Sequence, residues 1–467
     1  MLSNMSRARG GLGSNLALFH SDHFVSGLLS DGDSRIHTEG RSGLNKYLCR
    51  ATPSPELICA SSCTASPISQ TGFDRAADFF ALLTSAATPH ARRILMAEQA
   101  NSIEHCLLRH FKAVNLAEVI LCPSGTDALL TTARLLAAER PGAPMTAILP
   151  SASETGTGVP LAATCRDFDG QHRGKPRPDY DVRAVEVALR AANGAPLADD
   201  AVDSAFAAAA SHAKGRPVVY LTHGSKTDLI APRTPPAGAD VIVDACQARI
   251  DPTCVAAFLR RGWPVIITGS KFFGGPAFSG AVLFPLGRRV SLPPQRIPSG
   301  GAAGHTPGLG MILRWTAALD AIERFSSVGP SAAAFLQQRG ASIRRAIAAN
   351  PALVPIASAT RRGFGWADQP SIFTFAIRDP VVRARLLTAM ELRPIYERLA
   401  GEGKLLGQPA EIGAFGGLRV ALGARDLDQD SPDGFEQVIC AIGALGRERV
   451  ASPSDFAVAA SGSALPL

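Results

Sequence analysis

The sequence predicts an α/β protein in which a large domain, with a mainly parallel sheet flanked by helices, is joined to a smaller C-terminal α+β domain. Three observations support this fold class. The chain has 467 residues, 46% of them hydrophobic, which is enough for two or three domains with a sizeable core. Several strand-length segments are apolar throughout, as parallel strands buried on both faces are. Segments with apolar residues at helical spacing lie between several of these strands.

Changes in composition indicate where the parts of the chain begin and end. The N-terminal stretch is rich in Ser, Gly and Asp and the last residues are small and weakly polar, so we expect both ends to be loosely ordered. A Gly/Pro-rich connection at residues 293–310 follows the large domain. The predicted parts are an N-terminal tail and arm, the large domain, the small domain and a flexible tail, at residues 1–74, 75–290, 291–451 and 452–467.

The individual elements follow from hydrophobic periodicity. The first strand of the large domain is predicted at residues 117–122, and a helical pattern at 126–139 follows it. Further strands of this domain are predicted at residues 146–149, 217–222, 241–243 and 265–268. In the small domain, helices are predicted at residues 311–325 and 331–349, and strands at 371–377 and 418–421.

Charge and cysteine content exclude several function classes. The formal net charge is +7 and the pI about 9.1, but the Arg pairs are scattered and no basic run with interleaved aromatic residues occurs, so we expect no nucleic-acid partner. No window reaches the length of about 18 apolar residues that a membrane-spanning helix needs, so we expect no membrane role. The nine cysteines form neither a disulfide framework nor a zinc motif, so we expect no metal site and a reducing, cytoplasmic location.

Candidate chemistry lies at the ends of the predicted strands, because ligands of an open parallel sheet bind outside the carboxyl ends of its strands. The first candidate segment is Pro123-Ser124-Gly125-Thr126-Asp127, between a strand and a helix. Its small residues, and the N–H groups that a first helical turn leaves unpaired, suit a phosphate. An ordinary Ser/Thr helix cap is the alternative.

Three charged residues provide the other candidates. Asp244 ends an apolar strand, where a buried carboxylate needs a cation or a good donor, such as a ring N–H of a heterocyclic cofactor; a structural salt bridge or a helix cap is the alternative. Lys271 follows a buried apolar strand and precedes aromatic residues and glycines. A partly desolvated amine is what a Schiff-base nucleophile requires. Arg419, in a late strand, offers a bidentate fork for a substrate carboxylate.

The order of these segments resembles that in the fold-type I pyridoxal-phosphate enzymes, and among them the class V aminotransferase and cysteine-desulfurase-like group. A small-residue and Thr turn comes first, an Asp followed three residues on by Gln comes later, and a Lys comes about one strand after that. The resemblance implies that Gly125 and Thr126 bind the phosphate of pyridoxal 5'-phosphate and that Asp244 pairs with its ring nitrogen. It implies that Gln247 contacts the ring-hydroxyl side and that Lys271 forms the Schiff base.

Two further residues are matched by the same resemblance. Ser270 stands where many members of the group have a His that touches the phosphate, and its hydroxyl can do the same. Thr306, in the segment 304–307, resembles the turn by which a neighbouring subunit reaches the phosphate. The resemblance therefore implies a homodimer with shared active sites.

The sequence also departs from the group. Where an aromatic residue or His usually stacks on the cofactor ring, the segment 153–156 has neither. Near the ring hydroxyl, His223 is the candidate, although a structural histidine is the alternative. The arm that often crosses the active site in this fold contains Asn45, a candidate substrate contact, or a packing residue. Residues 401–417 lack the catalytic Cys of a desulfurase.

The resemblance implies an enzyme of amino-acid metabolism that acts on the α-amino group of an amino acid, or of a related amine, through Lys271. Arg419 and the missing lyase-type Cys favour an aminotransferase. A pyridoxal-phosphate-dependent lyase that eliminates a β or γ substituent, with C–S cleavage as one case, is the alternative. A non-catalytic scaffold of the same fold is a further alternative. The presence of both Lys271 and Asp244 argues against this alternative.

Overall fold

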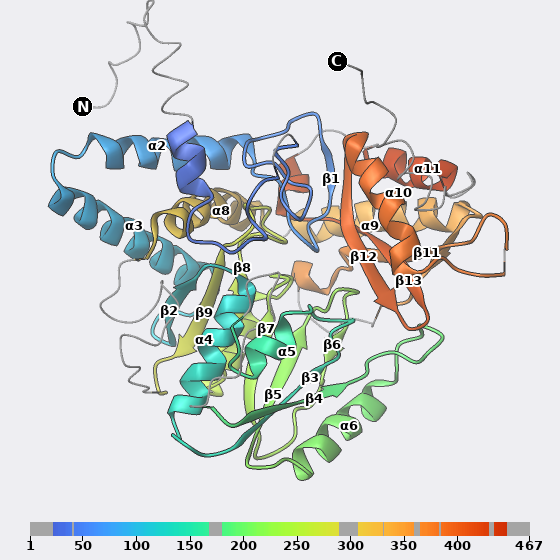
Figure 1. The fold of residues 1–467 in the computed structure, drawn as a ribbon, viewed down its shortest axis with the longest axis horizontal. Coiled ribbons are helices and arrows are strands. Elements are labelled where there is room, and N and C mark those ends of the chain that lie inside the picture. Colours follow the sequence, from blue (N-terminus) through green and yellow to red (C-terminus); the bar gives the residue numbers. More distant parts are fainter. Residues whose placement is uncertain are drawn as a thin grey trace, which may run out of the picture.

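A computed structural model describes residues 22–39, 42–167, 180–288, 307–329, 331–358, 365–382, 384–428 and 434–445. These residues form two sheets with helices around them (Figure 1). The larger sheet has the strand order β2-β9-β8-β7-β5-β3-β4, with β6 paired to β5, and the smaller has the order β1-β12-β13-β11-β10. The two-part α/β architecture that the sequence predicts is confirmed.

The strand directions of the larger sheet bring several strand ends together. Its strands are β2 (Ala117–Cys122), β3 (Met145–Pro150), β4 (Val182–Val187), β5 (Arg216–His223), β6 (Ile230–Ala231), β7 (Asp240–Ala245), β8 (Val265–Thr268) and β9 (Gly280–Pro285). Strand β3 is parallel to β4 and β5, and β7 is parallel to β5 and β8. Strand β9 is antiparallel to both β2 and β8, so β2 points the same way as β8. The residues that follow β2, β3, β5, β7 and β8 therefore meet at one edge of the sheet.

Helices cover both faces of this sheet, which is why its strands are apolar throughout. On one face, strand residues such as Leu149 and Tyr220 pack in a single core with α4 (Gly125–Ala138) and α5 (Val159–Ala163). On the other face, Ile148 and Val219 share a core with α6 (Asp199–Ser211). The helix α7 (Pro252–Arg260) covers the same side farther along the sheet.

Three long helices lie together beside the larger sheet: α2 (Gln70–Ser85), α3 (Pro89–His110) and α8 (Leu309–Val328) (Figure 1). The Thr71 hydroxyl on α2 donates to Asp320 on α8 at 2.7 Å. The indole of Trp315, fully buried on α8, donates to the carbonyl of Gly280 at 3.0 Å. This bond fixes α8 to strand β9 of the larger sheet.

The smaller sheet joins the N-terminal arm to the C-terminal segment. Its strands are β1 (Ile58–Ala60), β10 (Leu353–Pro355), β11 (Ile372–Ile377), β12 (Lys404–Ile412) and β13 (Phe415–Ala421). Around it lie α9 (Ser331–Ala349), α10 (Ala389–Gly401) and α11 (Gly434–Leu445), with the short 3-10 helices η2 (Gly365–Asp368) and η3 (Ala424–Asp428). Strand β1 pairs in parallel with β12, so the arm is part of this sheet.

Three further findings concern membrane-spanning helices, metal-ligand clusters and the cysteines. Within the described ranges, no helix combines the length and apolar character needed to cross a bilayer. The same ranges contain no group of three or more His, Cys, Asp or Glu side chains placed to hold a metal ion. All nine cysteines are free thiols.

Candidate active site

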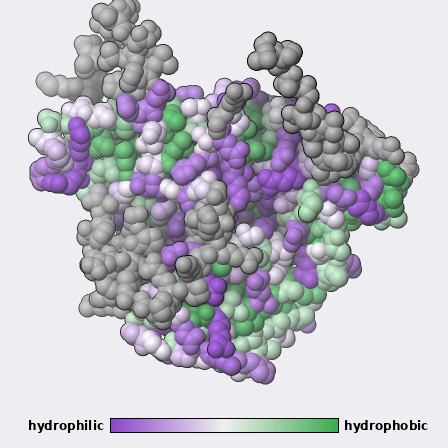
Figure 2. Space-filling view, viewed as in Figure 1, coloured by the Kyte–Doolittle hydropathy of each residue, from purple (hydrophilic) through white to green (hydrophobic). Residues whose placement is uncertain are grey.

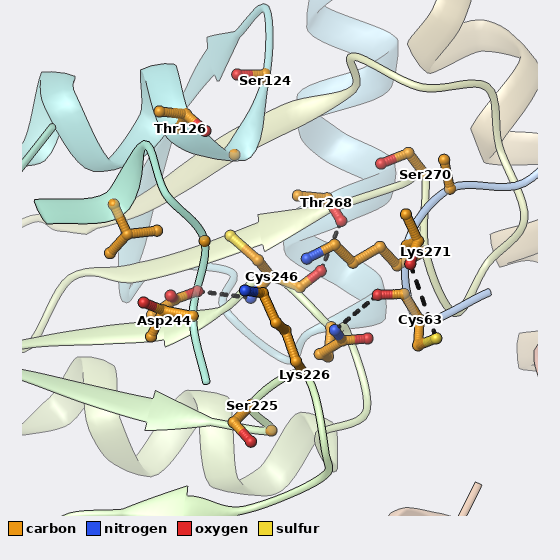
Figure 3. Close-up of a pocket in the computed structure, with 18 of the residues that line it drawn as sticks. Cys63, Ser124, Thr126, Ser225, Lys226, Asp244, Cys246, Thr268, Ser270 and Lys271 are labelled. Atoms are coloured by element: carbon orange, nitrogen blue, oxygen red, sulfur yellow. Dashed lines mark hydrogen bonds between the residues drawn. The ribbon is translucent and has the colours of Figure 1, made fainter. Parts of the chain in front are cut away.

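One cavity lies at the edge of the larger sheet where the parallel strands end. It is lined by the segments after β2, β3, β5, β7 and β8, by residues 63–65 of the arm, and by residues of β12 and β13. Figure 2 shows hydrophilic residues gathered between the two sheets on this face. Figure 3 shows Lys226, Asp244, Cys246 and Lys271 around the same space. Both sheets and the arm are needed to build the cavity.

The turn between β2 and α4 has the features of an anion-binding turn. Ser124 caps the helix, because its side chain accepts a hydrogen bond from the N–H of Asp127 at 3.2 Å. The cap does not use the N–H groups of Gly125 and Thr126, which have no partner within the helix at its first two positions. The Arg35 guanidinium lies beside this turn, 3.4 Å from the Thr126 hydroxyl. The turn is therefore both a capped helix start and a site whose N–H donors lie at the positive end of the helix dipole, beside the ion pair of Arg35 and Asp33.

Close packing against Gly280 holds this turn in place. A Cβ added to Gly280, on strand β9, would lie 2.3 Å from the backbone carbonyl carbon and oxygen of Ser124. Gly280 pairs with Cys122, the last residue of β2, so the strand and the turn approach each other at this point. Any side chain here would push the turn away from the sheet.

We expect Gly280→Ala to lower the free energy of unfolding by about 1–3 kcal/mol, because the added methyl group meets backbone atoms that have no room to move. Urea denaturation measures this change. Gly287→Ala is the matched control, since a Cβ at Gly287 meets nothing within 4 Å. Equal stability of the two variants would show that the turn shifts without cost.

Asp244 and Gln247 line the cavity from the segment at the end of β7. Asp244 is 7% exposed, and its Oδ1 accepts a hydrogen bond from the N–H of Cys246 at 3.1 Å. Among the residues described, no Lys, Arg or His lies within ion-pair distance of this carboxylate, so it is available to a donor in the cavity. The Gln247 side chain is held by the protein: its amide donates to the carbonyl of Cys63 at 3.0 Å and accepts from Arg249 at 2.9 Å.

Lys271 enters the cavity from the turn after β8. Figure 3 shows its side chain extending toward Thr268 and Cys246. In the part of the chain that the structure describes, its Nζ makes no hydrogen bond. The turn is tight, because Gly274 has a φ of 70° and its N–H donates to the carbonyl of Lys271 at 2.9 Å. Ser270, which precedes the lysine, also lines the cavity.

Arg419 faces the cavity from the smaller sheet, on β13. Its Nη1 donates to the carbonyl of Lys226 at 3.3 Å, and its Nη2 donates to the Thr64 hydroxyl at 3.2 Å and to the carbonyl of Gln408. Its Nε is buried and, within the described residues, has no hydrogen-bond partner. The guanidinium is thus fixed in orientation, and the second N–H of Nη1 is left for a ligand.

No family model matches the chain, and no curated protein sequence does. Among solved structures, the cystine C–S lyase C-DES, in complex with its product cysteine persulfide, has a TM-score of 0.55 at 15% identity, covering 83% of this chain and 98% of that chain. The cysteine desulfurase CsdA from Escherichia coli has a TM-score of 0.53 at 12% identity, covering 84% and 95%. Oryza sativa TDC, solved with PLP and tryptamine, has a TM-score of 0.52 at 14% identity, covering 94% and 100%.

The chain has the fold of the fold-type I pyridoxal-phosphate enzymes. At these identities the likeness concerns the fold, so the activity has to be argued from the residues of the cavity. In this fold-type I chain, the candidate residues that line one cavity are Gly125, Thr126, Asp244, Gln247, Ser270, Lys271 and Arg419.

The structure does not bring two other candidates, His223 and Asn45, to this cavity. His223, the last residue of β5, does not line it, and its ring lies 6.3 Å from the ring of Phe258 on α7. Asn45 does not line it either; its side-chain oxygen accepts hydrogen bonds from the N–H groups of Tyr47 and Cys49, which shapes a turn of the arm. Thr306 lies outside the described residues.

Other residues line the cavity without having been candidates: Arg35, Tyr47, Glu154 and Lys226. Glu154 and Lys226 follow β3 and β5, so the strand-end rule that found Asp244 applies to them equally. No signal in the sequence points to Arg35, because the segment around it has no periodicity.

Glu154 stands in the segment where a stacking ring was expected, and it belongs to a buried polar network. Glu154 is 2% exposed, and its carboxylate accepts hydrogen bonds from Arg190 at 2.7 Å, from Ser225 at 2.5 Å and from Thr227 at 2.7 Å. This network ties the segment after β3 to the segment after β5. It therefore fixes the side of the cavity that holds Lys226.

Proposed function

We propose that the chain is a pyridoxal-phosphate-dependent enzyme that acts on the α-amino group of an amino acid, and that it transfers this amino group. One observation carries the proposal: Lys271, Asp244 and the turn at 124–126 line a single cavity, and Arg419 faces the same cavity from the smaller sheet. An amine, a carboxylate without a cation and an anion-binding turn are the groups that this cofactor requires.

The residues of the cavity fit the cofactor. The N–H groups of Gly125 and Thr126 and the hydroxyl of Ser270 would hold its phosphate, with Arg35 beside the turn. Asp244 would accept the ring N–H, which explains a buried carboxylate with no basic partner in the described part of the chain. Gln247 would lie on the ring-hydroxyl side, and Lys271 would bind the aldehyde carbon through Nζ. When bound, the cofactor serves as a sink for the electrons released from a bond to the substrate α-carbon.

Each residue then has a defined task. The Asp244 carboxylate would accept a hydrogen bond from the protonated ring nitrogen and so favour that protonation state. Arg419 binds the substrate carboxylate and so fixes how the bonds of the α-carbon are oriented. The Lys271 amine would act as the acid–base group, accepting the proton from the substrate α-carbon through its Nζ and holding it for later return to the product. The arm, through Thr64, holds the Arg419 fork in place.

Covalent mapping tests this assignment, because two lysines of the described residues, Lys226 and Lys271, line the cavity. The protein is loaded with pyridoxal phosphate, reduced with borohydride and digested, and the modified peptide is identified by mass spectrometry. We expect the label on Lys271. A label on Lys226, or no label after reconstitution, would contradict the assignment.

A C–S or other β- or γ-eliminating lyase is the second candidate. It is favoured by the presence of a C–S lyase among the structures of similar fold and by two cysteines, Cys63 and Cys246, in the lining of the cavity. Burial raises the pKa of the Cys246 thiol, which keeps that group protonated and argues against its use as a nucleophile.

The products distinguish the two reactions. A transaminase given only an amino acid releases one keto acid per active site and needs an added keto acid to continue. A lyase releases ammonia, and sulfide from a thiol substrate, through many turnovers without any addition. We also propose a homodimer, which light scattering tests through the molar mass in solution.

A further inference from the structure

The cavity contains a second amine, Lys226, that the proposed reaction does not use. Lys226 follows β5, and its Nζ donates a hydrogen bond to the carbonyl of Ala152, after β3, at 2.8 Å. In the larger sheet, strands β9, β8 and β7 lie between β5 and β2, so Lys226 is far along the sheet edge from the anion-binding turn. Binding of the cofactor phosphate therefore does not explain why Lys226 lies in the cavity.

The backbone on both sides of Lys226 is fixed. Its N–H donates to the carbonyl of Glu154 at 2.7 Å, and the neighbouring side chains Ser225 and Thr227 both donate to the Glu154 carboxylate. Glu154 is therefore engaged with these hydroxyls and with Arg190. Such a rigid setting is typical of a residue that has to present one group at one place.

Lys226 and Arg419 are two neighbouring basic residues of the cavity, and the charge of Arg419 acts to lower the pKa of Lys226. The carbonyl of Lys226 accepts a hydrogen bond from Arg419. Within the described residues, no carboxylate lies within ion-pair distance of either side chain. Two like charges held together in a partly buried cavity raise the free energy of the empty site, and an anionic ligand would relieve this repulsion.

Both cations keep donors for a ligand. The Lys226 ammonium has three N–H donors, of which the carbonyl of Ala152 takes one. Arg419 has five; its bonds to Lys226, Thr64 and Gln408 use three of them and its Nε is buried from solvent, which leaves one donor on Nη1. The cavity thus offers two separate cationic donor groups, one from each sheet.

We propose that the substrate is an α-amino acid whose side chain ends in a second anionic group, with its α-carboxylate on Arg419 and its side-chain anion on Lys226. This inference rests on the proposed function, because it takes the amino acid to be the substrate. Lys226 is then a specificity-determining residue that selects an acidic side chain over its neutral isostere.

A spectral titration of the reconstituted protein tests the inference. L-Aspartate and L-glutamate are compared with L-asparagine and L-glutamine, and the change in visible absorption gives the dissociation constants. We expect the wild type to prefer the acidic amino acids. In Lys226→Met, the affinity for them should fall about 10- to 100-fold, as when a hydrogen bond between charged groups is lost, and the affinity for the amides should be unchanged. Lys226→Arg should keep the preference.

The control and the contrary outcomes separate this inference from the proposed function. Lys214→Met removes the same charge from an exposed position before β5 and should change none of the affinities. Equal affinities of the wild type for acids and amides, or equal weakening of both in Lys226→Met, would overturn the inference and leave the proposed function standing. A wild type that binds no pyridoxal phosphate would overturn both.

The preference should also depend on pH. Burial, followed by repulsion from Arg419, lowers the pKa of Lys226 to about 8. Lys271 also acts to lower the pKa, while Glu154 and Glu411 act to raise it. Lys226 is protonated below this pH, so the ratio of acid to amide affinity should be highest below pH 8 and fall as the pH rises through it. A ratio that stays constant from pH 7 to 9 would contradict a role for the ammonium.

Discussion

The Lys271→Ala enzyme is expected to lose turnover by at least about 10²–10⁴-fold, the range that a positioned acid–base group contributes to proton transfer. The loss should be larger still, because the same Nζ is the group that would hold the cofactor covalently. The protein should fold normally, since Lys271 makes no hydrogen bond to the described residues through its Nζ. The measurement is kcat of the reconstituted variant, together with the visible absorption of the protein.

Lys214→Ala is the matched control, because it removes an exposed lysine far from the cavity, and it should turn over like the wild type. A Lys271→Ala enzyme that retained a tenth or more of the activity would assign proton transfer to another group. Lys226 would then be the first to examine, since its amine also lines the cavity.

Glu154→Ala is expected to lower the free energy of unfolding by about 3–5 kcal/mol, the usual cost of leaving one partner of a buried ion pair alone. The side chains of Arg190 and Glu154 are only 5% and 2% exposed, and their ion pair measures 2.7 Å. Without the carboxylate, Arg190 keeps a buried charge, and the hydroxyls of Ser225 and Thr227 lose their acceptor. Urea denaturation of the two proteins measures the difference.

A surface ion pair provides the comparison. Arg393 and Glu397 are four residues apart on α10, at 2.9 Å, and both side chains are 51% exposed. Because water screens such a pair, Glu397→Ala should change the free energy of unfolding by less than about 1 kcal/mol. If Glu154→Ala has an equally small effect, water reaches Arg190 when the carboxylate is removed.

The helices and strands that the sequence predicts are present in the structure, because elements with buried faces have a periodic pattern of apolar residues in the sequence. The predicted strands at 117–122 and 265–268 and the helix at 331–349 have the bounds of β2, β8 and α9. The sequence does not predict strand β12, because Lys404, Gln408 and Glu411 interrupt the apolar pattern by which a buried strand is recognised. Strand β9 is apolar and follows β8 without a crossover helix between them. The sequence does not show that it runs antiparallel to its neighbours, because an apolar run is compatible with either strand direction.

The site could be predicted where chemistry follows a strand end, and not where it depends on distant pairing. Asp244 and Lys271 stand at the ends of apolar strands, and both line the cavity. The neighbouring position after β5 was assigned to His223, yet Lys226, three residues on, lines the cavity instead. Which of these residues reaches the cavity depends on where β5 ends and how the chain turns after it. The sequence alone does not specify that end.

Strand β1 has a consequence for the order in which the molecule is completed during synthesis. It pairs with β12, and this pairing brings Cys63 and Thr64 of the arm to the cavity. At roughly 5–20 residues per second, the ribosome needs tens of seconds to make the chain between the two strands. All strands of the larger sheet are synthesised before β12, the partner of β1. A chain interrupted before residue 404 would therefore contain Lys271 and Asp244 but not Arg419. The cavity is therefore complete only after the N-terminal arm has paired with the C-terminal sheet.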